Sequence, residues 1–389
     1  MMLGTPLVAE HRSAAQPLFL SVKTRASRRG RILTTPMSGS SAAITLWVTR
    51  SRVGAAVRIL AGALALLAPA AGASAGTTER VSVDSAGNQA DGESSSPAIS
   101  ADGRFVAFVS FATNLVPGDS NGRGDVFVRD RLTQTTERVS VDSAGNEANR
   151  GSDGPSISAN GRFVVFWSDA TNLVRGDTNG VADVLVHDRL TRTTERVSVD
   201  SAGNEGNGAS GLQSHSEYSI SADGRFVAFV SSATNLVPGD TNGVADVFVH
   251  DRLTRTTERV SVDSAGNQGN DGSFSPAVSA NGRFVAFVSF ATNLAAGDSD
   301  SPFVSGVFVH DRHTGTTELV SVDGGGNRAN GSSQHPSISA TGAFVAFVSF
   351  ATNLVPGDTN EQPDVFVRDR KTAEDSDTTW HHRRRPRRR

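Results

Sequence analysis

The 389-residue chain contains no cysteine, one tyrosine, three methionines and three tryptophans. Without cysteine there is no disulfide scaffold, no cysteine-ligated zinc or iron–sulfur site and no thiol nucleophile. Hydrophobic residues make up only 37% of the chain and charged residues 20%. This composition excludes a multi-span membrane protein and fits a globular chain of one large domain or two ordinary ones.

Basic residues are scarce in the middle of the chain. The formal net charge is −3, but residues 76–370 hold 21 basic and 36 acidic residues, whereas both ends are basic. Because binding to a phosphate backbone depends on a basic surface, we do not expect nucleic acid as a partner. The acidic excess is compatible with cation binding.

The first 75 residues have the order of a secretory leader. Arg50, Arg52 and Arg58 precede the apolar run 59–68, and Ala73-Ser74-Ala75 precedes Gly76. We therefore expect cleavage near Ala75 and export to the periplasm or the extracellular space, with an uncleaved anchor as the alternative. Met37 is an alternative start that would leave a leader of ordinary length.

Residues 371–389 form the other basic end. This segment ends in six arginines interrupted by one proline, and its one aromatic residue is Trp380. Such a short charged run is typical of a solvated, disordered tail. The folded part is therefore predicted to be residues 76–370.

This central part consists of one unit repeated at a nearly fixed period. The octapeptide Thr-Thr-Glu-Arg-Val-Ser-Val-Asp begins at residues 77, 135, 193 and 256, and a fifth copy at 316 has Leu in place of Arg. In the third unit, strand-like segments at 218–221, 225–231, 247–250 and 258–262 are separated by turns and loops. Four antiparallel strands per repeat predict an all-β fold, a β-propeller, since the coils of a parallel β-helix are much shorter.

The order of the segments predicts how the ring closes. A lone fourth strand, 79–83, comes first, and a third strand, 365–368, comes last. Pairing the two would complete a fifth blade and remove two exposed sheet edges, so we expect five blades with Velcro closure by the N-terminal strand. An incomplete six-bladed propeller is the alternative.

The repeat resembles that of TolB-like propellers. The resemblance lies in Ser-Ala-Asp-Gly-Arg-Phe-Val-Ala-Phe, residues 100–108, and in the later Asp-Val-Phe-Val-x-Asp segment. It covers roughly residues 77–370 and implies a platform that binds a protein or an envelope glycan. The chain departs from TolB because the N-terminal α/β domain of that family has no counterpart between Gly76 and the first blade.

The long loop between the second and third strands carries an Asp-x-Asn-Gly sequence with a later Asp. Carboxylate and amide oxygens are ligands for a hard cation, so calcium is a possible ligand here, and the loop resembles the calcium loop of integrin-type propellers. The same residues also cap turns without any metal, and that alternative stays open. The candidate ligands are Asp119, Asn121, Asp125, Asp177, Asn179, Asp183, Asp240, Asn242, Asp246, Asp358, Asn360 and Asp364.

Catalysis has less support in the sequence. The main departure from the repeat is an insertion at 208–217, in which His215 and Glu217 are a candidate acid–base pair but more typical of a solvated loop. His187, His250 and His310 recur at a position where other repeats have arginine, so they are not expected to be metal or catalytic residues. We predict no catalytic residues and a non-enzymatic binding scaffold, with a secreted polysaccharide hydrolase as the alternative.

Overall fold

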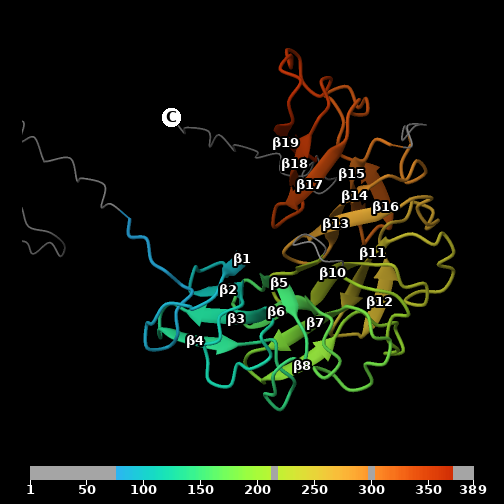
Figure 1. Cartoon of the computed structure of the whole chain (residues 1–389). Coiled ribbons are helices and arrows are strands. Elements are labelled where there is room, and N and C mark those ends of the chain that lie inside the picture. The colour runs from blue at the N-terminus through green and yellow to red at the C-terminus, as the bar shows by residue number, and fades with distance from the viewer. Residues whose placement is uncertain (1–75, 212–217, 297–302, 371–389) are drawn as a thin grey trace, which may run out of the picture. The chain divides into compact units, whose positions relative to one another are not determined.

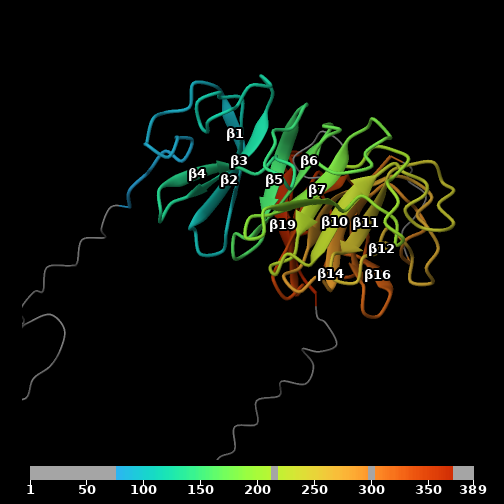
Figure 2. The same cartoon turned by 90° about the horizontal axis from the view of Figure 1, so that it is seen from below.

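A computed structural model describes residues 76–211, 218–296 and 303–370. These residues form nineteen strands in five antiparallel sheets that follow one another along the chain (Figures 1 and 2). The all-β fold class and the five blades of a β-propeller are therefore confirmed. Residues 1–75 and 371–389, where the leader and the tail were predicted, lie outside the described residues.

Each sheet is one blade with its strands in sequence order. The first blade contains β1 (Ser94–Ile99), β2 (Phe105–Ser110), β3 (Asp125–Asp130) and β4 (Thr135–Arg138), and the second contains β5 (Ser152–Ile157), β6 (Phe163–Ser168), β7 (Asp183–Asp188) and β8 (Thr193–Arg196). The third contains β9 (Tyr218–Ile220), β10 (Phe226–Ser231), β11 (Asp246–Asp251) and β12 (Thr256–Arg259). The fourth contains β13 (Ser273–Val278), β14 (Phe284–Ser289), β15 (Gly306–Asp311) and β16 (Thr316–Leu319), and the fifth contains β17 (Ser333–Ile338), β18 (Phe344–Ser349) and β19 (Asp364–Asp369).

The fourth strands begin and end earlier than the sequence predicted. In the third blade the predicted strand 258–262 is observed as β12, which ends at Arg259. Beyond it, the Ser261 hydroxyl accepts a hydrogen bond from Val247 N at 3.1 Å and donates one to Asp246 at 2.6 Å. A side chain therefore replaces the backbone ladder at this end of the sheet.

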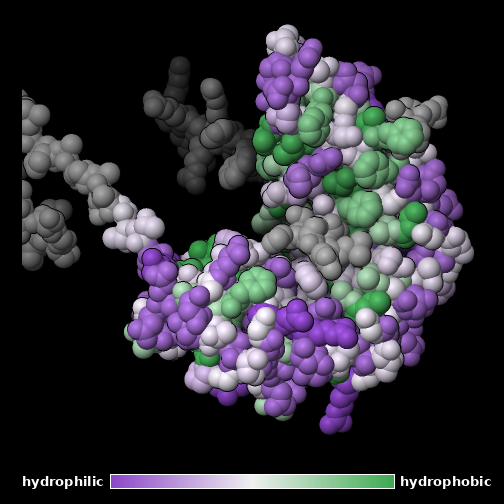
Figure 3. All heavy atoms as spheres, viewed as in Figure 1, coloured by the Kyte–Doolittle hydropathy of each residue, from purple (hydrophilic) through white to green (hydrophobic). Residues whose placement is uncertain are grey.

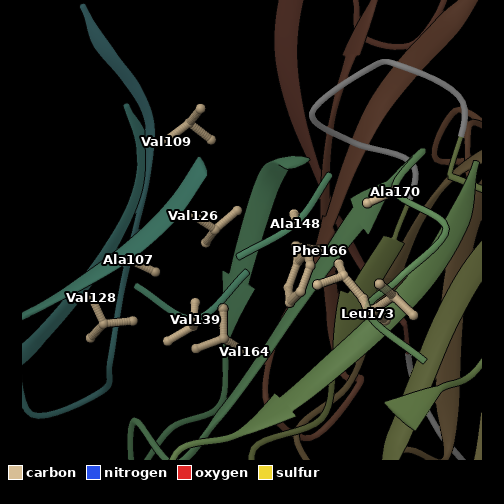
Figure 4. Close-up of a cluster of buried hydrophobic side chains, with 11 residues drawn as sticks. Ala107, Val109, Val126, Val128, Val139, Ala148, Val164, Phe166, Ala170 and Leu173 are labelled. Atoms are coloured by element: carbon tan, nitrogen blue, oxygen red, sulfur yellow. The ribbon is translucent and has the colours of Figure 1, made fainter. Parts of the chain in front are cut away.

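The hydrophobic core is divided into layers between successive blades. Figure 4 shows the first layer, where Val109 and Val126 of the first blade face Phe166 and Leu173 of the second. Equivalent clusters join the second to the third, the third to the fourth and the fourth to the fifth blade. Because an internal blade is covered on both faces, its middle strands are continuous apolar runs.

In the second to fifth blades, a glycine in the turn after the first strand allows a close approach of the preceding blade. Gly161 has a φ of +72°, and a Cβ there would overlap the ring of Phe105 in the preceding blade. Gly224, Gly282 and Gly342 meet Phe163, Phe226 and Phe284 in the same way. The Asp-Gly and Asn-Gly turns of the repeat thus serve the contact between blades as well as the hairpin.

The predicted Velcro pairing is not formed in this structure. Among the described residues β19 pairs with β18 alone, and residues 79–83 lie beside the first blade. There they make the contacts that every fourth strand makes with the following blade: Glu79 pairs with Arg131 as Glu137 pairs with Arg189. The segment is therefore held by the first blade, and the fourth position of the fifth blade is not filled by it.

Candidate functional site

Two of the predicted loop residues and a glutamate gather around an arginine in the first blade. Arg138 of β4 places Nη1 at 2.5 Å from Glu147, 3.5 Å from Asp125 and 3.7 Å from Asp119. The carboxylate oxygens lie within 4.8 Å of one another. The structure therefore brings Asp119 and Asp125 together as predicted, and it adds Arg138 and Glu147, which the sequence analysis did not include.

The asparagine of this loop is engaged in turn chemistry. Asn121 Oδ1 accepts a hydrogen bond from Arg123 N at 2.6 Å, and its Nδ2 donates to Asp125 and to Ala148 O at 3.0 Å each. Asn179, Asn242 and Asn360 accept the same bond from the amide two residues later. These amide oxygens are thus committed to the backbone, as the turn alternative predicted.

The same cluster recurs in the second and third blades, but the number of carboxylates around the arginine differs. In the second blade Arg196 Nη1 lies 2.8 Å from Asp183, 2.8 Å from Glu205 and 3.9 Å from Asp177. The third blade keeps Asp240 and Asp246, each 3.3 Å from Arg259. It has Gln268 at the position where the first two blades have glutamate. In the first two blades three carboxylates face one guanidinium, and in the third only two do.

The last two blades depart further from this cluster. The fourth has Gly306 and Leu319 at the positions of the second aspartate and the arginine, and residues 298–300 lie outside the described residues. The fifth keeps Asp358 and Asp364, but within residues 303–370 its sheet has no fourth strand that would supply an arginine. Asp364 is half-buried, whereas its counterparts Asp125, Asp183 and Asp246 are fully buried.

Burial controls the ionisation of the clustered aspartates. It raises the pKa of Asp119 to about 6, with the negative charge of Asp125 as the next cause. Burial likewise raises the pKa of Asp177 and of Asp240. The opposite holds for Asp130, whose pKa is lowered by hydrogen bonds from Arg104 at 2.9 and 2.6 Å. Each cluster therefore contains carboxylates that are partly shielded from solvent.

The second long loop contains a closed polar turn in every repeat. Asp84 Oδ1 accepts hydrogen bonds from the amides of Ala86 and Asn88, and its Oδ2 accepts one from Asn88 Nδ2, all between 2.8 and 2.9 Å. The bond from the Asn88 side chain lowers the pKa of Asp84. The same turn forms at Asp142–Asn146, Asp200–Asn204, Asp263–Asn267 and Asp323–Asn327.

The three repeated histidines are buried against a neighbouring strand. His187, His250 and His310 are buried, and Nδ1 of each lies 2.8–2.9 Å from a threonine hydroxyl of the neighbouring strand. Burial lowers the pKa of all three. His215 and Glu217 of the insertion lie outside the described residues.

The loop motifs of the sequence did not predict a further group of polar and aromatic residues. It includes Trp167, Asp169 and Arg150, which line one pocket between the first and second blades. The signal that could have found them is their departure from the repeat, since the other blades carry different residues at these positions.

Comparisons with known proteins show similarity in fold. TolB from Acinetobacter baumannii is 19% identical, with a TM-score of 0.40 over 68% of this chain and 53% of that one. A putative TolB from Agrobacterium tumefaciens is 16% identical, with a TM-score of 0.42 over 72% and 78% of the two chains. The β-propeller domain of the Trilobed protease from Pyrococcus furiosus is 11% identical, with a TM-score of 0.44 over 72% and 70%.

No protein-family model and no curated protein matches the chain. Among the described residues, no helix is long and apolar enough to cross a membrane.

Proposed function

We propose that the chain is an exported, non-enzymatic β-propeller that acts as a binding scaffold for a protein or an envelope glycan. The observation that carries this proposal is the rim of identical Asp-x-x-x-Asn turns, one after each fourth-strand segment. A rigid polar surface repeated from blade to blade suits a partner that makes several equivalent contacts.

The test uses the full chain immobilised and presented with purified envelope proteins and envelope polysaccharides. We expect one component to be retained, and its retention to fall when Asp142, Asp200 and Asp263 are all replaced by alanine, because these carboxylates hold the turns closed. Retention that is unchanged by the triple substitution would contradict the proposal. Release of new reducing ends from a polysaccharide would favour the hydrolase alternative.

Calcium at the arginine-centred clusters is a second proposal, favoured by their charge. In the clusters around Arg138 and Arg196, three carboxylates surround one guanidinium, so negative groups outnumber the positive one. The ligands would be carboxylates of Asp119, Asp125 and Glu147 in the first blade, and of Asp177, Asp183 and Glu205 in the second.

Thermal unfolding with millimolar calcium and then with a chelator tests this proposal. Calcium at about 100 times its Kd would add roughly 2.7 kcal/mol to the free energy of unfolding. The matched variant carries Glu147→Gln and Glu205→Gln, which reproduces Gln268 of the third blade, and it should lose the shift. If the unaltered chain shows no shift, calcium does not bind these clusters and this second proposal is wrong.

A further inference from the structure

A pocket of about 380 Å³ opens between the first and second blades. It is large enough for a small ligand and combines aromatic, basic and acidic side chains. The side chains that the argument uses are Phe111, Arg123, Arg150, Asp153, Trp167 and Asp169. None of them belongs to the Asp-x-x-x-Asn turns or to the arginine-centred clusters.

The pocket is built from residues that break the repeat. Trp167 occupies a second-strand position at which the four other blades have Val109, Val230, Val288 and Val348. Asp169 replaces the Phe or Ser of the other blades, namely Phe111, Ser232, Phe290 and Phe350. Arg150 stands where the other repeats have Gly92, Gly208, Asp271 or Gly331. These three non-repeat residues line the same pocket, although the rest of the chain repeats its sequence closely. This indicates a local role beyond the fold.

The sole tyrosine of the chain supports the floor of this pocket. Tyr218 is buried, and its hydroxyl lies 2.8 Å from Asp153 O while accepting a hydrogen bond from Trp167 N at 3.3 Å. The other blades have proline at this position. Tyr218 thus fixes the backbone that carries Asp153 and Trp167, which holds the pocket in shape.

The polar groups of the pocket have unused hydrogen-bonding capacity. Asp169 Oδ1 is buried and has no hydrogen-bond partner within the described part of the chain. Arg123 and Arg150 line the same pocket, and the positive charge of Arg150 also acts on Asp177 of the second-blade cluster. A buried acceptor without a donor is costly unless a ligand or water supplies one. Two arginines that line the same pocket as this carboxylate favour a ligand that carries negative charge as well as hydroxyl groups.

The apolar part of the pocket suits a ring. Phe111 is 53% exposed at the edge of the pocket, whereas Trp167 lines the pocket and is half-buried, packed against the core layer between the second and third blades. Aromatic rings that keep some surface free bind amphipathic rings, and an acidic group beside them is bound by arginine through paired hydrogen bonds. A simple inorganic anion would use the arginines but leave the aromatic faces and Asp169 without a role.

We propose that this pocket binds an acidic sugar unit, with its ring against Trp167 and Phe111. A hydroxyl of the sugar donates to Asp169 Oδ1, and its carboxylate accepts from Arg123 and Arg150. The proposal rests on the scaffold function and narrows it, because the envelope partner becomes a glycan that contains uronate or a similar carboxylated sugar.

An array of defined oligosaccharides, some containing uronate and some neutral, tests the proposal with the full chain. We expect retention of uronate-containing oligosaccharides and weaker retention of neutral ones. Titration of the best oligosaccharide should change the tryptophan fluorescence. Trp167→Val should abolish that response, while Asp169→Ser and Arg150→Gly should each weaken binding about tenfold or more.

Each substitution introduces a residue that another blade carries at the same position, so the variants are expected to fold, as circular dichroism will show. Phe350→Ser is the matched control in the fifth blade, at the position of Asp169, and should leave binding unchanged. Absence of any uronate binding, equal binding of neutral sugars, or binding insensitive to Trp167→Val and Arg150→Gly overturns the proposal. If another envelope component then binds through the Asp-x-x-x-Asn turns, the scaffold function stands without this pocket.

Discussion

The third blade and the fifth blade have almost the same sequence in their middle strands but very different surroundings. Every residue of β11 is buried, whereas the equivalent residues of β19 alternate between exposed and half-buried. Val365 and Val367 are 75% and 67% exposed, and hydrophobic spheres are visible over the fourth and fifth blades in Figure 3. The sequence of a blade thus determines its strands, but its neighbours determine its burial.

An internal blade and the fifth blade also differ in the charged partners of their aspartates. In the second blade Asp183 receives hydrogen bonds from Arg196 and Ser198, both contributed by the fourth-strand segment. The matching residues for the fifth blade are Arg80 and Ser82, which lie beside the first blade, where Arg80 donates to Gln89 at 2.6 Å. The fifth blade therefore keeps the aspartates of the cluster, while the matching arginine, Arg80, lies beside the first blade.

The largest expected effect comes from removing the arginine of an internal cluster. Arg196→Ala leaves three partly buried carboxylates without their cation, which should lower the free energy of unfolding by about 3–5 kcal/mol. Arg80→Ala is the matched change at an exposed position and should cost less than about 1 kcal/mol. Urea unfolding of both variants measures the difference. Equal losses would show that Arg80 pairs with the fifth blade in solution.

A second pair of variants concerns the aromatic contact between blades. Phe284 is 4% exposed and has Arg370 of the next blade over its ring at 4.7 Å, while Phe344 at the same position of the fifth blade is 49% exposed. Phe284→Ala should therefore cost about 3–5 kcal/mol and Phe344→Ala only about half as much. The measurement is again urea unfolding. A Phe344→Ala cost as large as that of Phe284→Ala would mean that another surface covers the fifth blade.

Most of the architecture could be predicted from the sequence, because repeats make the same local pattern visible several times. The Asp-Gly turns, the Phe and Val runs of the second strands and the asparagine caps all formed as the pattern indicated. The position of residues 79–83 could not be predicted. They have the sequence of a fourth strand, and such a segment can pair with the fifth blade or contact the first blade, as it does here.

The candidate site was harder to predict than the fold. Asp119 and Asp125 were expected to meet, but the guanidinium of Arg138 between them comes from a strand that the loop motif does not include. The pocket around Trp167 and Asp169 is built from single departures from the repeat, and a search for repeated motifs passes over such residues.

The smallest predicted effect is on the pH dependence of stability. Because the pKa of Asp119 is raised to about 6 in the folded chain, the folded state holds this proton more tightly than the unfolded state, whose value is near 3.8. Stability from this group is therefore present below about pH 4 and is lost as the pH rises through about 6. In thermal unfolding, Asp119→Asn should reduce the decrease in unfolding temperature between pH 4 and pH 7. An unchanged profile would show that Asp119 is ionised throughout this range.

Hydrogen–deuterium exchange of the full chain tests the central comparison most directly. The account predicts rapid exchange at alternate amides of β19, whose outer edge has no partner strand among the described residues, and strong protection throughout β11, which is paired on both sides. Equal protection of 364–369 and 246–251 would contradict it, because a strand would then have to occupy the fourth position of the fifth blade.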